Sequence, residues 1–178
     1  MSANLHLIKN FKNTFEIKKM KTLQLLLLLV TTTTFSQKIP VIDLENLDGE
    51  TVSSSIFTAK EDKIKIITFW ATWCIPCLNE LSSISEVYDD WKSKYEFDFY
   101  AISIDDDRTV RKVAPLTNGK NWPYTILLDT NQDFKRNLNI NTIPHLIMVK
   151  NGEIIYTKNG FVKGDESKIE EVLSKKVD

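Results

Sequence analysis

The segment of residues 64–81 constrains the fold of this chain more than any other, because it carries both cysteines between two strong secondary-structure signals. Before the cysteines, "IKIITFW" at residues 64–70 is a β-branched run that predicts a buried central strand. After them, apolar residues recur at three- and four-residue steps, which predicts an amphipathic helix over residues 75–94. "FDFYAISI" at 97–104 predicts a second strand, so the order indicates a β-α-β crossover with a parallel strand pair.

The segments on either side of this unit predict further elements. "IPVIDLENLDGETVSSSIF" alternates apolar and polar residues around Asp48-Gly49, which predicts a short opening hairpin. A helix is expected over residues 106–116, with Asp105 to Asp107 forming a capped and solvated loop before it. "LTNGKNWP" then breaks the helical pattern and indicates a central insertion.

In the last third of the chain, "YTILLD" predicts a strand. Two more strands and a closing helix are expected after it. "NQDFKRNLN" is expected to be a short helix or turn capped by Asp129 or Asn131. "IPHLIMVKNGEIIYTKNGF" predicts a hairpin that turns at Asn151-Gly152, and Asp165 is expected to cap a final helix. Parallel strands followed by an antiparallel hairpin indicate an α/β fold, with a mixed sheet and helices on both faces.

Residues 1–36 have the pattern of a secretory signal peptide. Lysines precede a short apolar run at residues 23–30, small residues follow, and cleavage is expected after Ser36. The true start is expected at Met20, and an uncleaved N-terminal membrane anchor is the alternative. Residues 37–178 then form a single domain in the periplasm or another extracytoplasmic compartment.

The charge balance argues against nucleic acid as a partner. The chain has 23 basic and 24 acidic residues, and five of the lysines but only one acid lie in residues 1–36. The remaining domain is therefore mildly acidic, whereas nucleic-acid-binding domains are basic. Two cysteines in 178 residues are also too few for a disulfide scaffold.

The two cysteines are expected to perform redox chemistry. Cys74 comes where a helix begins, and the unpaired N–H groups there stabilise a thiolate. Pro76 suits the first helical turn, and Cys77 lies one turn later, within disulfide reach and more sheltered. We therefore predict that Cys74 attacks and that Cys77 resolves, with their redox-active disulfide as the only redox group and no separate cofactor or metal. A zinc site lacks ligands, and a staple closing so short a loop would stabilise little.

Several motifs together resemble one family. "FWATWC-x-P-C-x-x-E", "YAISID", "NWPYTILLD" and "TIPHLIMVKNGEI" resemble the TlpA/ResA-like branch of exported thiol-disulfide oxidoreductases in the thioredoxin superfamily, over residues 39–175. The resemblance implies a thioredoxin fold with an N-terminal hairpin and a central insertion. It also implies reduction of protein disulfides outside the cytoplasm, with apocytochrome c thiols as one substrate class and a membrane dithiol as electron donor.

The resemblance also assigns residues that contact the substrate. Pro144 matches the family's cis-proline, which faces the cysteines, and a cis bond exposes the backbone of Ile143 to pair with a bound polypeptide. Trp73 is expected to form an apolar landing surface near Cys74. Ile75 and Pro76, between the cysteines, are expected to contact the substrate as well.

Glu80 has two interpretations. An acid in the first turns of a helix is favourable anywhere, because it compensates the helix dipole. However, Glu80 lies at the margin of the apolar stripe, three residues from Cys77. TlpA/ResA-like proteins carry a Glu here, and Thr68 replaces the buried Asp of cytoplasmic thioredoxins. We therefore expect a partly buried Glu80 with a raised pKa that exchanges a proton with Cys77.

Three other functions would use the same residues. A disulfide oxidase or isomerase would use the same cysteines, although the intervening Ile75-Pro76 lacks the histidine of the strong periplasmic oxidant. A copper-binding module would use both cysteines and His145, which we otherwise expect to be packed or solvated. A peroxiredoxin would need Thr at position 71, where this chain has Ala.

Overall fold

The computed structural model describes residues 38–177. The predicted signal peptide, and the alternative membrane anchor, lie outside these residues. The strands are β1 (Asp43–Asn46), β2 (Thr51–Ser53), β3 (Ile64–Trp70), β4 (Phe97–Ser103), β5 (Thr125–Leu128), β6 (His145–Lys150) and β7 (Glu153–Asn159). The helices are α2 (Ile75–Lys94), α3 (Val113–Lys120), α4 (Asp133–Asn137) and α5 (Asp165–Val177), with 3₁₀ turns η1 (Ser54–Phe57) and η2 (Val110–Lys112).

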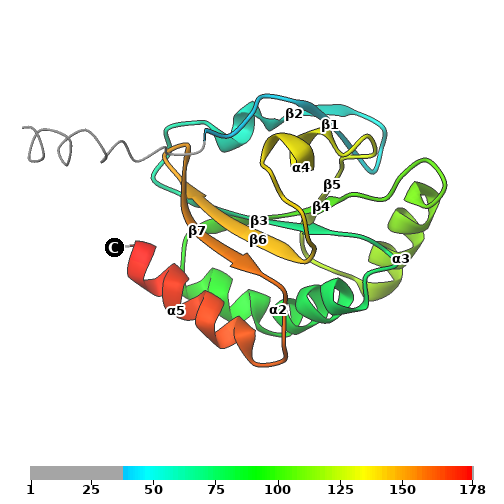
Figure 1. The fold of residues 1–178 in the computed structure, drawn as a ribbon. Helices are drawn as coiled ribbons and strands as arrows, with labels where there is room; N and C mark the ends of the chain where they lie inside the picture. The colour runs from blue at the N-terminus through cyan, green and yellow to red at the C-terminus, as the bar shows by residue number, and fades with distance from the viewer. Residues whose placement is uncertain (1–37, 178) are drawn as a thin grey trace, which may run out of the picture. The chain divides into compact units, whose positions relative to one another are not determined.

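The strands form one seven-stranded mixed sheet in the order β2-β1-β5-β4-β3-β6-β7 (Figure 1). β3, β4 and β5 are parallel, whereas β1 joins β5 and β6 joins β3 in antiparallel fashion. The opening hairpin thus extends one side of the sheet, and the closing hairpin β6-β7 extends the other. The predicted mixed α/β fold is confirmed, including the bounds of β3 and α2.

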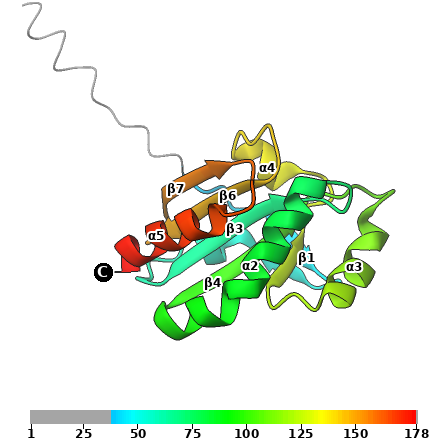
Figure 2. The same ribbon diagram turned by 90° about the horizontal axis from the view of Figure 1, so that it is seen from below.

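Helices cover both faces of the sheet. α2 and α5 lie side by side on one face, and α4 lies on the other (Figures 1 and 2). All seven residues of β3 are buried between these layers. The aromatic ring of Phe69 lies 5.6 Å from that of Phe134 in α4, while Thr68, one position earlier, bonds to α2. Consecutive side chains of β3 therefore reach opposite faces, as a strand requires.

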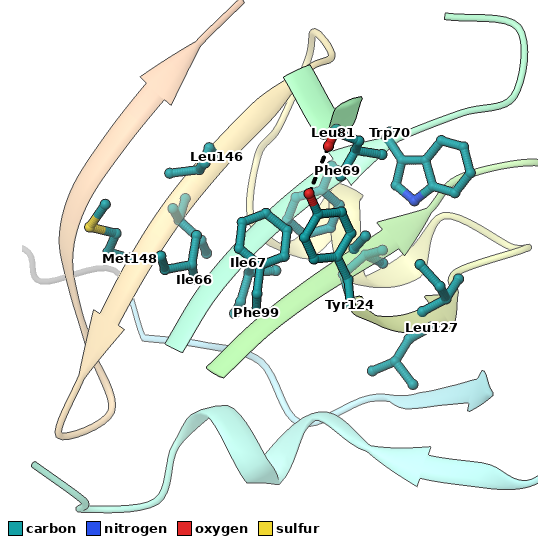
Figure 3. Close-up of a cluster of buried hydrophobic side chains, with 14 of the residues drawn as sticks. Ile66, Ile67, Phe69, Trp70, Leu81, Phe99, Tyr124, Leu127, Leu146 and Met148 are labelled. Atoms are coloured by element: carbon teal, nitrogen blue, oxygen red, sulfur yellow. Dashed lines mark hydrogen bonds between the residues drawn. The ribbon is translucent and has the colours of Figure 1, made fainter. Parts of the chain in front are cut away.

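The core beside α2 also fixes that helix to the sheet. Tyr124, just before β5, donates a hydrogen bond of 2.7 Å from its hydroxyl to the carbonyl of Leu81 in α2 (Figure 3). The ring of Tyr124 packs 4.4 Å from that of Phe99 in β4. Because both rings and the hydroxyl are held, the N-terminal half of α2 has a defined position over the parallel strands.

The helix predicted over residues 106–116 begins and ends later than expected. A turn and η2 precede α3, which continues through the predicted break as far as Lys120. Pro115 is tolerated because it is the third residue of α3, where a missing N–H costs no intrahelical hydrogen bond. The C-cap residue of α3 is Asn121, whose backbone is left-handed with φ of 51°.

Two of the predicted helix caps have different outcomes. Asp129 accepts the N–H groups of Phe134 and Lys135 at 3.1 and 2.9 Å, so its side chain caps the first turn of α4 as predicted, although the N-cap residue itself is Gln132. The prediction for Asp165 is wrong, because this residue is the first of α5 and its carboxylate accepts the N–H of Val162, which precedes the helix. Within residues 38–177, none of the helices has both the length and the apolarity needed to cross a bilayer.

Candidate active site

Cys74 lies at the junction of β3 and α2, as its N-cap residue. Its backbone is extended, its carbonyl accepts the N–H of Leu78 at 3.1 Å, and its Sγ accepts the N–H of Cys77 at 3.3 Å. Pro76 occupies the first turn, where it removes no helical hydrogen bond. The sulfur therefore lies where N–H groups stabilise negative charge, as the sequence predicts.

The two cysteines form a disulfide, with their Cα atoms 5.3 Å apart. They differ in accessibility, since Cys74 is 6% exposed and Cys77 is fully buried. Cys74 is less exposed than a free surface thiol, but its rank relative to Cys77 agrees with the prediction. Of the two cysteines, only Cys74 therefore keeps any solvent-exposed surface.

Glu80 is buried completely, more deeply than predicted. Its Oε2 accepts a hydrogen bond of 2.6 Å from the hydroxyl of Thr68 in β3, and its Oε1 is buried without a hydrogen-bond partner among the described residues. Burial raises the pKa of Glu80 to about 7, although the Thr68 hydroxyl opposes this shift. Glu80 is thus a carboxyl group that changes protonation near neutral pH.

An ion pair lies on the same side of the sheet as Glu80. Thr68 is aligned with Leu146 in β6, and Leu146 with Lys158 in β7. Lys158 Nζ pairs with Asp165 at 2.8 Å, and both side chains are largely buried. The positive charge of Lys158 lowers the pKa of Glu80, and the negative charge of Asp165 raises it.

The Ile143-Pro144 peptide bond is cis. Pro144 is buried and Ile143 half-buried. The next residue, His145, pairs with Phe69 in β3, so the loop lies where β3 leads into the cysteines. The carbonyl of Pro144 accepts the N–H of Gly160 at 2.8 Å, which ties this loop to the end of β7.

Apolar side chains are exposed on both sides of Cys74. Trp73 is 60% and Ile75 is 70% exposed, and Pro76 is also exposed. A surface groove of about 530 Å³ continues from Pro76 along α2 to Val162, which precedes α5 and is itself exposed. Three of the predicted contact residues, Trp73, Ile75 and Pro76, are therefore exposed next to Cys74, whereas Pro144 is buried.

His145 is packed rather than placed among metal ligands. It is half-buried beside Phe69, and burial lowers its pKa. Over residues 38–177, no group of three or more His, Cys, Asp or Glu side chains is arranged to hold a metal ion.

Asp105 is a residue of this site that the sequence interpretation placed wrongly. It was expected in a solvated loop, but it is only 1% exposed. Its carboxylate accepts the N–H and the hydroxyl of Thr72, two residues before Cys74. The available signal was its position just after β4, because the carboxyl ends of parallel strands meet at one edge of a sheet.

Comparisons with known proteins agree with this geometry. The Redoxin family model matches residues 34–173. Thiol-disulfide oxidoreductase ResA of Bacillus thuringiensis subsp. konkukian is 24% identical over 139 residues, covering 76% of this chain and 75% of the relative. Sporulation thiol-disulfide oxidoreductase A of Bacillus subtilis is 24% identical over 126 residues, covering 70% of this chain and 74% of that relative.

A solved structure shows the same architecture. The solution structure of a thioredoxin-like protein from Porphyromonas gingivalis is 39% identical, with a TM-score of 0.68 over 82% of this chain and 94% of that one. Since the Redoxin match runs from before the first strand into the last helix, this chain belongs to the Redoxin family, as a TlpA/ResA-like thiol-disulfide oxidoreductase of the thioredoxin superfamily.

Proposed function

We propose that this protein reduces protein disulfides outside the cytoplasm through the dithiol form of Cys74 and Cys77. The observation that carries the proposal is the asymmetry of the pair: Cys74 caps α2 and is 6% exposed, whereas Cys77 is fully buried. A nucleophile must meet the substrate sulfur, and the resolving thiol must meet only Cys74. The two positions fit these two roles.

The reaction transfers two electrons to the substrate in two exchanges. The Cys74 thiolate attacks one sulfur of the substrate disulfide, the substrate S–S bond breaks, and one substrate thiolate leaves. Cys77, after losing its proton, then attacks Cys74 Sγ in the mixed disulfide. The second substrate thiolate leaves, and the Cys74–Cys77 disulfide remains. An external dithiol donor restores the reduced pair.

Glu80 is proposed as the group that takes the proton from Cys77. Cys77 is buried, so its thiol cannot lose a proton directly to bulk water. Glu80 lies one helical turn away, its pKa is raised to about 7, and its Oε1 has no other partner among the described residues. A base with a pKa near the working pH is effective in general base catalysis.

The substrate polypeptide is proposed to lie across the exposed surface at Trp73, Ile75 and Pro76. The half-buried Ile143, before the cis bond to Pro144, offers a backbone edge at the end of β3 where the chain reaches the cysteines. An extended segment of the substrate can add to this edge as a short strand. Such backbone pairing suits an enzyme that acts on several proteins.

The cellular setting follows from the leader pattern in residues 1–36 and from the family resemblance. We propose export by this leader, reduction of protein disulfides that include the disulfide formed by apocytochrome c thiols, and a membrane protein as dithiol donor. The mass of the exported protein tests the leader, because cleavage after Ser36 removes residues 1–36 and an anchor retains them.

The direction of the reaction is tested by the reduction potential of the purified domain in glutathione buffers. A value nearer that of thioredoxin, about −270 mV, than that of DsbA, about −120 mV, is expected for a reductase. A value near that of DsbA would instead make the protein an oxidase. Stoichiometric Cu(I) binding without any disulfide exchange would favour the copper module.

A further inference from the structure

The carboxylate of Asp105 connects the end of β4 to the loop before the cysteines. Oδ2 accepts the backbone N–H of Thr72 at 2.8 Å and the hydroxyl of Ser103 at 2.8 Å. Oδ1 accepts the hydroxyl of Thr72 at 2.6 Å. Three hydrogen bonds to a carboxylate with 1% exposure form a rigid connection, because a charge-assisted hydrogen bond is strong where the local dielectric is low.

The loop that Asp105 holds leads directly into Cys74. The N–H of Cys74 donates to the carbonyl of Ala71 at 3.1 Å, so residues 71–74 form a tight turn. On the other side, the N–H of Ile104 donates to the carbonyl of Trp70 at 2.9 Å. Thr72 is therefore fixed against β4 at the point where the chain leaves β3 and turns into α2.

We infer that Asp105 is a positioning residue for the dithiol, acting through Thr72. By fixing Thr72 it sets the direction in which Cys74 enters the first turn of α2, so that Cys74 Sγ stays within reach of the N–H of Cys77. This inference rests on the proposed role of Cys74 as the attacking thiolate. Without the connection, the loop can relax and the thiolate loses part of its stabilisation.

Asp105→Ala removes all three hydrogen bonds and tests the inference. We expect a roughly tenfold lower thiolate fraction of Cys74 near neutral pH, read from thiolate ultraviolet absorbance, and a comparable fall in the rate of attack on a model disulfide. Thr72→Val is a milder variant that removes only the hydroxyl bond, and its effect should be smaller and in the same direction.

Asp105→Asn separates hydrogen bonding from charge. Its amide oxygen can accept the Thr72 N–H while its amide NH₂ donates to the Thr72 hydroxyl, which is free to turn. We therefore expect Asn to restore most of the thiolate fraction that Ala loses. If Asp105→Asn lowers the thiolate fraction as much as Asp105→Ala does, restoring these hydrogen bonds is not enough and the positioning role is wrong.

Asp129→Ala is the matched control. Asp129 is also buried, follows the neighbouring parallel strand, and accepts two N–H groups, but these belong to α4 on the other face of the sheet. Both Ala variants should lower the free energy of unfolding, and only Asp105→Ala should lower the thiolate fraction of Cys74. If the two variants change stability alike and neither changes the thiolate fraction of Cys74, the role of Asp105 is structural only. Wild-type protein without any exchange activity would instead overturn the proposed function.

Discussion

The hydroxyl of Thr68 lies 2.6 Å from Oε2 of Glu80, and both side chains are fully buried between β3 and α2. The position that carries an Asp in cytoplasmic thioredoxins thus holds a hydrogen-bond donor in this chain, and the carboxyl group approaches from the helix instead. Thr68 holds one oxygen of Glu80 and leaves Oε1 for exchange. β3 and α2 therefore hold this buried carboxyl group between them, and in the proposed mechanism it takes the proton of Cys77.

Removing the Thr68 hydroxyl should raise the pKa of Glu80. The hydroxyl stabilises the carboxylate, and a hydrogen bond to a charged group contributes about 1.5–3 kcal/mol, so Thr68→Val is expected to raise this pKa by about one to two pH units. The side-chain carboxyl signal of Glu80 in an NMR titration measures it. Thr117→Val, which removes another buried hydroxyl in α3, is the control and should leave the Glu80 titration in place.

Lys158→Met should also raise the pKa of Glu80. The substitution removes a positive charge that favours the carboxylate, and it leaves Asp165, which disfavours it. Lys168→Met is the matched control, because Lys168 also pairs with the Asp165 carboxylate, at 2.9 Å, but its side chain is 70% exposed. In the same NMR titration, the pKa of Glu80 should rise for Lys158→Met and hardly change for Lys168→Met, since solvent screens an exposed charge. Equal shifts would contradict an effect of the buried pair.

The protonation of Glu80 should make folding stability depend on pH. In the folded protein its pKa is raised to about 7 from an ordinary value of 4.5, so the folded state binds the proton more tightly. The buried Glu80 carboxylate therefore lowers the free energy of unfolding. This loss of stability is absent below pH 4.5, develops as the pH rises towards 7, and reaches about 3 kcal/mol above pH 7. Glu80→Gln should therefore gain stability relative to wild type between pH 5 and 8.

Urea unfolding of the oxidised proteins at several pH values measures this gain. Glu86→Gln removes an exposed carboxylate from the same helix and reports the effect of the substitution itself. If the stability difference between Glu80→Gln and wild type is the same at pH 5 and pH 8, Glu80 does not titrate between the two.

Glu80→Gln should slow resolution and spare attack. Gln cannot accept the proton of Cys77, so the decay of the mixed disulfide should slow at least about tenfold, whereas its formation at Cys74 should change less. Rapid-quench thiol trapping separates the two rates. Loss of both rates to the same extent, or of neither, would argue against the proton-exchange role.

The sequence predicts the centre of the domain better than its periphery. β3 and α2 have the predicted bounds, because a β-branched run and a Cys-x-Pro-Cys helix start are strong local signals. The start and end of α3 are shifted, because residues 107–112 form a turn and η2 first, and because Thr117 to Lys120 continue the helix into the segment predicted to break it.

The burial of Glu80 and Asp105 could be predicted only in part. Helical spacing places Glu80 at the margin of the apolar stripe, but its surroundings come from other elements, with a bond from Thr68 in β3 and the charges of Lys158 and Asp165 acting on it. The sequence predicts a solvated Asp105, since three successive aspartates are typical of a surface loop. Its burial arises from pairing with Thr72 across the ends of β3 and β4, which is a tertiary contact.

The central claim, that Cys74 attacks and Cys77 resolves, is tested most directly by trapping the mixed disulfide with each single-cysteine variant. Reduced Cys77→Ala and Cys74→Ala proteins are exposed to the same disulfide-bonded protein and the adducts are quantified by mass spectrometry. The structure predicts a stable adduct at Cys74 in Cys77→Ala, and at least about tenfold slower adduct formation in Cys74→Ala, because Cys77 is fully buried. Equal or faster reaction at Cys77 would contradict the assignment.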